Sequence, residues 1–185
     1  RNRGEEEPLM FDDISNASTL EHLDKPTSVA YADVDSDGDP DLLIGAINRQ
    51  YLLLNDGNAH FTDVTDPWGL GYENTEPLRD VMFAAGVFAD YDTDGYLDVF
   101  TPTWIHASDR DFGAEEDFLF RGTPLAFEPV LNLFGSTEPP SPSLAAAWFD
   151  VDGSGSLDLW VVHDYGLYFS PNRLFLSERT SDGVV

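Results

Sequence analysis

Short apolar runs, separated by turns rich in Asp, Asn and Gly, extend along most of this chain. Runs of this length, bounded by turn residues, are typical of β-strands rather than helices. Three of the runs lead into a cluster of aspartates and carry an aromatic residue two positions before the first Asp, namely Tyr31, Phe88 and Trp148. A small or modest apolar residue precedes each aromatic one, and this alternation predicts a strand with two differently packed faces.

The pattern around each cluster repeats. A second apolar run starts directly after it, a third run follows at residues 51–54, 117–120 and 173–176, and a fourth at 61–65 and 127–130. The clusters begin 57 and 60 residues apart, which indicates an internal repeat. The sequence therefore predicts an all-β fold made of three four-stranded antiparallel repeats, the third of which lacks its fourth strand.

We expect a single domain or segment over residues 1–185. Its repeats are predicted at residues 27–66, 81–131 and 144–185, the last being incomplete. Residues 1–26 are predicted to form an N-terminal tail and the outer strand of a preceding repeat, because residues 11–15 (FDDIS) are similar to residues 61–65 (FTDVT).

The three acidic clusters, at residues 33–41, 90–98 and 150–158, follow one plan. Numbered from the first Asp, oxygen-bearing side chains stand at positions 1, 3, 5 and 9, and Gly stands at position 6. A hard dication such as Ca²⁺ binds six to eight oxygens, and the backbone carbonyl of position 7 can add one. The alternative is a set of solvated Asp-Gly turns, since both residues favour turns. The candidate metal-binding residues are Asp33, Asp35, Asp37, Asp39, Asp41, Asp90, Asp92, Asp94, Tyr96, Asp98, Asp150, Asp152, Ser154, Ser156 and Asp158.

These loops differ from an EF-hand. An EF-hand needs a bidentate Glu at position 12 and a helix on each side. Position 12 is Ile44, Thr101 or Val161, and the flanks are strand-like. The third loop is expected to be the weakest site, because Ser154 replaces an acid.

The residues resemble the FG-GAP or VCBS repeats of calcium-binding β-propellers, which include integrin alpha chains and many secreted bacterial proteins. The resemblance rests on the three Asp-x-Asp-x-(Asp/Ser)-Gly-x-x-Asp loops, the hydrophobic residue after each, residues 44–46 (IGA) and the turn at 54–61 (LNDGNAHF). It covers about residues 9–178. It implies that each repeat is a propeller blade and that the loop between its first two strands binds one calcium ion, about three ions in all.

Propellers have four to eight blades. Three blades do not easily close a ring, so we expect this chain to be part of a larger or oligomeric propeller. The remaining blades would come from the same longer protein or from a second copy of the chain.

Strand direction places the calcium loops and the turns between strands 3 and 4 at one end of the blades. Two longer segments, around residues 68–79 and 102–116, fall at the other end. They contain the candidate residues for a protein or glycan ligand, Trp68, Tyr72, Trp104, His106 and Arg110. The alternative is that the two tryptophans cap the core.

Charge excludes some partners. The chain has 35 Asp and Glu against 9 Lys and Arg, a formal net charge of −26, which argues against binding nucleic acid or an anionic membrane surface. The longest apolar run, residues 81–89, is too short to cross a bilayer. Cysteine is absent, so disulfides and thiolate metal sites are excluded.

Catalytic motifs are also missing from the sequence, and the pair His163–Asp164 is read as a structural hydrogen-bonded pair. The sequence therefore predicts a non-enzymatic, extracellular or secreted scaffold for adhesion, assembly or ligand recognition, with structural calcium. The cell surface and the periplasm are also open as locations. The alternative function is the propeller portion of a secreted polysaccharide-degrading enzyme, a lyase or hydrolase.

Overall fold

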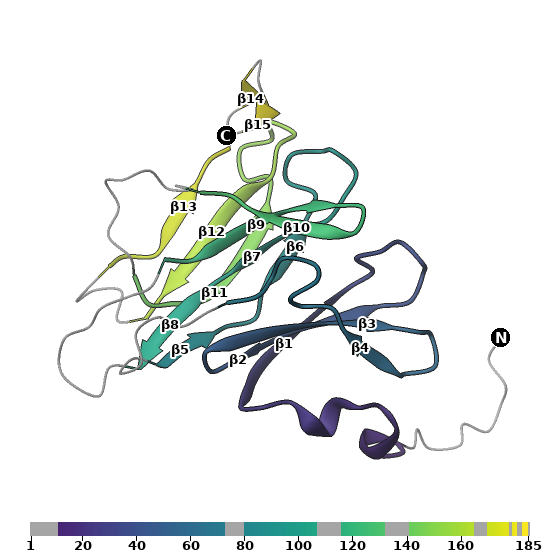
Figure 1. The fold of residues 1–185 in the computed structure, drawn as a ribbon. Helices are drawn as coiled ribbons and strands as arrows, with labels where there is room; N and C mark the ends of the chain where they lie inside the picture. The colour runs from purple at the N-terminus through teal and green to yellow at the C-terminus, as the bar shows by residue number, and fades with distance from the viewer. Residues whose placement is uncertain are drawn as a thin grey trace, which may run out of the picture.

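The computed structural model describes residues 11–72, 80–106, 116–131, 141–164, 170–177, 179–180 and 183–184. Within these ranges the regular structure is almost entirely strand, and three antiparallel sheets lie side by side as blades of an open arc (Figure 1). The predicted all-β class and repeated sheets are therefore confirmed.

Blades 1 and 2 are four-stranded meanders, and blade 3 has three strands. Blade 1 consists of β1 (Pro26–Ala32), β2 (Asp41–Ala46), β3 (Arg49–Asn55) and β4 (Phe61–Asp63). Blade 2 consists of β6 (Val87–Ala89), β7 (Asp98–Thr101), β9 (Phe118–Thr123) and β10 (Ala126–Pro129). Blade 3 consists of β11 (Ser143–Phe149), β12 (Asp158–His163) and β13 (Arg173–Phe175). Two short pairs accompany them: β5 (Asp80–Phe83) with β8 (Thr103–His106), and β14 (Arg179–Thr180) with β15 (Gly183–Val184).

The blades share one register. The residue after the last Asp of each loop pairs with the matching residue of the third strand, in the pairs Leu42–Leu53, Val99–Phe120 and Leu159–Phe175. The repeat seen in the sequence is thus a repeat of strand pairing as well.

The connection between the second and third strands of blade 2, β7 and β9, differs from the prediction. The sequence predicts a loop over residues 102–116, but Thr103–His106 is a strand that pairs with β5. Pro102 separates β7 from β8 because it has no N–H for the ladder, while its carbonyl accepts the N–H of Ala84 at 2.9 Å. The rest of the expected loop, residues 107–115, lies outside the described residues.

Apolar residues fill the two spaces between blades. Between blades 1 and 2, the buried residues are Leu43, Leu52, Trp68, Leu70, Val99, Phe120 and Phe127. Between blades 2 and 3 they are Phe100, Leu119, Leu159 and Val161. Blade 2 therefore packs one sheet face against blade 1 and the other against blade 3, as the alternation of side chains requires.

The N-terminal segment covers part of the free face of blade 1 (Figure 1). It contains two short 3₁₀ helices, η1 (Ser15–Ala17) and η2 (Leu20–His22). Leu20 and Leu23 pack against the buried cluster that contains Ile44 and Tyr51. Residues 11–14 are not in a strand here. No other blade lies beside them among the described residues, so their assignment to a preceding blade stays a prediction.

A half-buried carboxylate, that of Asp117, links the segment before β9 of blade 2 to blade 3. Asp117 Oδ1 accepts the N–H of Thr103 at 2.8 Å, and Asp117 Oδ2 accepts the hydroxyl of Ser143 in β11 at 2.7 Å. Burial raises the pKa of Asp117 to about 7, despite these hydrogen bonds.

Replacing this carboxyl with an amide, Asp117→Asn, should remove one source of pH dependence. Because the native pKa lies above the unfolded value, Asp117 contributes more stability as the pH falls from 8 towards 5.5. We expect the wild type to gain about 1–2 kcal/mol relative to the variant over that interval. Urea unfolding of both proteins at the two pH values measures this. Parallel pH profiles would contradict it.

Candidate metal centres

The first acidic loop connects β1 to β2 and folds around its own carboxylates. The N–H groups of Asp37 and Gly38 donate to Asp33 Oδ1 and Oδ2, both at 3.0 Å. The N–H of Asp37 also donates to Asp35 Oδ1 at 3.2 Å. The side chains at positions 1 and 3 therefore turn inward, toward the middle of the loop.

The other two loops repeat these contacts. In the second, Asp90 accepts the N–H groups of Asp94 and Gly95, at 3.0 and 3.1 Å. In the third, Asp150 accepts those of Ser154 and Gly155, at 3.0 and 2.9 Å. One loop geometry thus occurs at the same place in three successive blades.

Two positions of each loop have a left-handed backbone. Gly at position 6 was expected from the sequence, and Gly38, Gly95 and Gly155 have φ of 97°, 95° and 85°. The left-handed backbone at position 4 was not predicted. It is Ser36, Thr93 or Gly153, with φ of 62°, 62° and 75°. The small residue at this position in all three copies is the signal that the sequence carried.

The donor set fits a hard dication. Carboxylate oxygens lie within 4.8 Å of one another in three groups: Asp33, Asp35 and Asp37; Asp90, Asp92 and Asp94; Asp150, Asp152 and Asp158. Two oxygens on opposite sides of one Ca²⁺, each about 2.3–2.6 Å from the ion, lie about 5 Å apart, so this spacing suits a shared ion. Oxygen donors without sulfur or imidazole favour calcium or magnesium over zinc or copper.

The aspartate at position 9 has a second role that the sequence did not reveal. Asp41, Asp98 and Asp158 are almost fully buried. In each, Oδ2 accepts an N–H from position 2 of its loop, and Oδ1 accepts one from the end of the third strand or just beyond it. The donors are Val34 and Asn55, Tyr91 and Gly122, and Val151 and Ser177, all at 2.8–2.9 Å. This aspartate therefore fastens the loop to the sheet, and it would bind an ion with its remaining lone pairs.

Burial changes the pKa of two aspartates at position 9, Asp41 and Asp98. It raises the pKa of Asp41 and raises that of Asp98 to about 6, although two N–H groups oppose the shift in each case. A dication beside them would favour the ionised form.

Position 7 was predicted to bind through its backbone carbonyl. The N–H groups of Asp39, Tyr96 and Ser156 donate to the side chain of position 5, at 2.9, 3.0 and 3.3 Å. These contacts fix the backbone at position 7, and the carbonyl ligand stays a prediction. The Asp39 side chain also lies against Gly57, in the turn between β3 and β4. It is so close that a Cβ at position 57 would be 2.5 Å from Asp39 Oδ2. The loop and this turn share one end of the blade, as strand direction requires.

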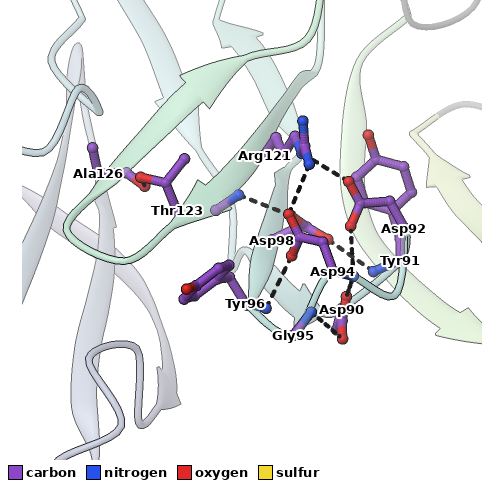
Figure 2. A network of polar contacts seen from close by, with 11 residues as sticks. Asp90, Tyr91, Asp92, Asp94, Gly95, Tyr96, Asp98, Arg121, Thr123 and Ala126 are labelled. Carbon is purple, nitrogen blue, oxygen red and sulfur yellow. Dashed lines mark hydrogen bonds and ion pairs between the residues drawn. The ribbon is translucent and has the colours of Figure 1, made fainter. Parts of the chain in front are cut away.

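A positively charged side chain from a neighbouring strand contacts the second loop (Figure 2). Arg121, in β9, lies with Nε 2.8 Å from Asp92 Oδ2 and Nη2 2.8 Å from Asp94 Oδ2. The repeat pattern in the sequence ends the third apolar run of blade 2 at residue 120 and predicts no role for Arg121. Strand pairing aligns Arg121 with Leu54 and Leu176, whereas the predicted runs in the sequence align Phe120 with these two residues.

Three of the candidate ligand residues, Trp68, Tyr72 and Trp104, contact other side chains of the molecule. Trp68 is buried and packs against Phe127, with ring centroids 6.4 Å apart, which agrees with the core-capping alternative. Tyr72 packs edge-on against Phe83 at 5.0 Å. Trp104 Nε1 donates to Asp164 Oδ2 at 3.0 Å. Arg110 and the side chain of His106 lie outside the described parts of the structure.

His163 and Asp164 have structural partners. His163 is buried, and its Nδ1 lies 2.7 Å from the carbonyl oxygen of Pro171, to which it donates. Burial lowers the pKa of this imidazole. Asp164 accepts the Trp104 indole N–H, as described above.

Comparison with known proteins agrees with the loop geometry. Residues 33–101 match the family described as FG-GAP-like repeat. The chain is also similar to cartilage acidic protein 1, with 32% identity to the mouse protein and 31% to the human protein over 145 residues. That alignment covers 73% of this chain and 20% of each relative, so the chain spans about a fifth of the length of the curated relatives it matches.

The matched residues 33–101 run from the first aspartate of the first loop to the end of β7. They therefore include two of the three acidic loops and the whole of blade 1 after its first strand. The third loop has the same contacts and the same register. Residues 33–101 thus match an FG-GAP-like repeat, and the third loop continues the same pattern in blade 3.

Proposed function

We propose that this chain is part of an extracellular, calcium-binding β-propeller scaffold for adhesion, assembly or ligand recognition, in which calcium is structural. One observation carries the proposal: the same inward-facing carboxylate loop occurs at the same end of three successive blades. A structural ion explains why the loop is repeated with the blade, since each copy fastens its own first two strands.

The calcium affinity that is typical of extracellular modules supports an extracellular location. Extracellular calcium modules bind with dissociation constants of about 10⁻⁴–10⁻³ M. Sites of that strength would be largely filled outside the cell and largely empty in the cytosol. In the part of the chain that the structure describes, no helix is long and apolar enough to span a membrane.

The open face of blade 3 supports a role in assembly. Trp160, Leu174 and Leu176 are 43%, 48% and 55% exposed. Their counterparts in blade 1 are Leu43 and Leu52, which are buried against blade 2, and Leu54, which packs beside them. We infer that a further blade covers this face, from a longer form of the protein or from a second copy.

The contacts of the other candidate residues favour the scaffold over the polysaccharide-degrading enzyme. The Trp68 ring is in the core, and the His163 ring nitrogen is bound to a carbonyl. Assaying the chain on a panel of glycans separates the two functions, and turnover of any of them would favour the enzyme.

Native mass spectrometry tests the calcium sites and the partner together. We expect three calcium ions per chain, two in Asp35→Asn, and three in Glu128→Gln, which removes the same charge from an exposed strand position. A doubled mass would identify a second copy as the source of the covering blade. If the wild type retained no calcium ions, or if both variants lost the same number of ions, the calcium proposal would be overturned.

A further inference from the structure

The three loops differ at one position of the neighbouring strand. Strand pairing aligns Arg121 with Leu54 in blade 1 and with Leu176 in blade 3. Only the second loop therefore has a basic side chain at this position, where the third strand passes the acidic cluster.

Arg121 binds the outward-facing oxygens of the loop. Asp92 and Asp94 present Oδ2 to the guanidinium, while their Oδ1 atoms accept the N–H groups of Asp94 and Tyr96. The two carboxylates are mostly shielded, with 15% and 24% of their side chains exposed, whereas Arg121 is about half exposed. The guanidinium thus bridges two acids that would otherwise repel each other, and it leaves their inner oxygens in the loop.

We propose that Arg121 is a built-in counter-ion of the second loop, which keeps this loop ordered without calcium and lowers its calcium affinity relative to a loop without the arginine. The affinity part rests on the proposed calcium function, whereas the ordering part does not. A fixed positive charge offsets carboxylate repulsion in the empty loop, so an incoming dication gains less by entering and is itself repelled. Of the two loops with Asp at positions 1, 3, 5 and 9, the second is then the less dependent on calcium.

Calcium affinity is tested on the second loop alone. Asp35→Asn and Asp152→Asn together weaken the other two loops, and Arg121→Leu in that background introduces the residue type found at this position in blades 1 and 3. Titration calorimetry should show calcium binding about tenfold tighter in the Arg121→Leu variant, the order of effect of one unit charge at a partly exposed site. The matched control is Arg49→Leu, which removes an equal charge and an ion pair to Asp63 at 3.1 Å, away from the loops. It should leave the affinity nearly unchanged.

Loop order is tested without calcium. In chelator and with no other substitution, Arg121→Leu should melt about 2–4 °C below the wild type, and limited proteolysis should begin at residues 90–98. Arg121→Lys should bind calcium as weakly as the wild type, because it keeps the positive charge. Its melting temperature in chelator should lie between those of Arg121→Leu and the wild type, because an ammonium cannot bridge both carboxylates in the same way.

The outcomes are distinct. Unchanged or weaker calcium binding in Arg121→Leu would overturn the affinity part, and an unchanged melting temperature and cleavage pattern in chelator would overturn the ordering part. If the wild type binds no calcium in any loop, the proposed function fails, while the chelator experiment still decides the role of Arg121.

Discussion

Chelating calcium is expected to lower the melting temperature of this protein by about 16–32 °C. A site filled at a hundredfold excess over its dissociation constant adds about 2.7 kcal/mol. Three such sites add about 8 kcal/mol, and in a chain of this size 1 kcal/mol corresponds to about 2–4 °C. The physical reason is the close approach of three carboxylates in each loop, within 4.8 Å, which an ion turns from repulsion into attraction. Calorimetric scans in calcium and in chelator measure the difference.

Single substitutions assign that difference to the loops. Asp35→Ala, Asp92→Ala and Asp152→Ala should each remove about a third of the calcium-dependent shift, with the third loop contributing least because Ser154 carries no charge. Coincident scans in calcium and in chelator would falsify the metal interpretation of all three loops.

The second large effect should appear without any metal. Asp41→Ala is expected to destabilise the chelated protein by about 2–4 kcal/mol, because it removes the acceptor of two N–H groups, those of Val34 and Asn55, at 2.9 Å each. The buried carboxylate holds the loop against the third strand, so its loss also leaves a small void.

The control for this effect lies in the same loop. Asp35→Ala removes an equal charge but only one weaker contact, the 3.2 Å bond from the Asp37 N–H. It should therefore change stability in chelator by less than about 1 kcal/mol. Urea unfolding of both variants in chelator makes the comparison. Equal losses would show that position 9 has no role beyond that of its neighbours.

The repeated features of the fold were predictable because they appear three times in the sequence. Strand order and the loop between the first two strands follow from aligning Asp33, Asp90 and Asp150, and the shared register agrees with that alignment. Alternation of side chains then identifies which residues face a neighbouring blade, as for Leu43 and Phe100.

Features that occur in one blade were harder to predict. Pro102 separates β7 from β8, in the connection between the second and third strands of blade 2. Whether a proline ends a strand or only interrupts it depends on what its carbonyl and its neighbours bind. The position of Trp68 in the core likewise depends on packing between blades that are distant in sequence.

The sequence predicts which residues make up each candidate metal centre, but it does not predict which role each aspartate has. Spacing identifies all the acids of each cluster. It does not separate Asp33, which faces the loop interior, from Asp41, which is buried and bound to two N–H groups. Nor does it link Arg121 to the second loop, since that contact depends on strand pairing across 27 residues.

The two ends of the arc are unequal, and this has a consequence for how the molecule loses structure. Leu20 and Leu23 shield part of the first sheet, whereas Trp160 and Leu174 of the last sheet face solvent. In a stack where each sheet is held chiefly by its neighbours, fraying starts at the less protected terminus. When no further blade covers the last sheet, opening should proceed from that sheet inward, and amide protons of β12 should exchange before those of β2.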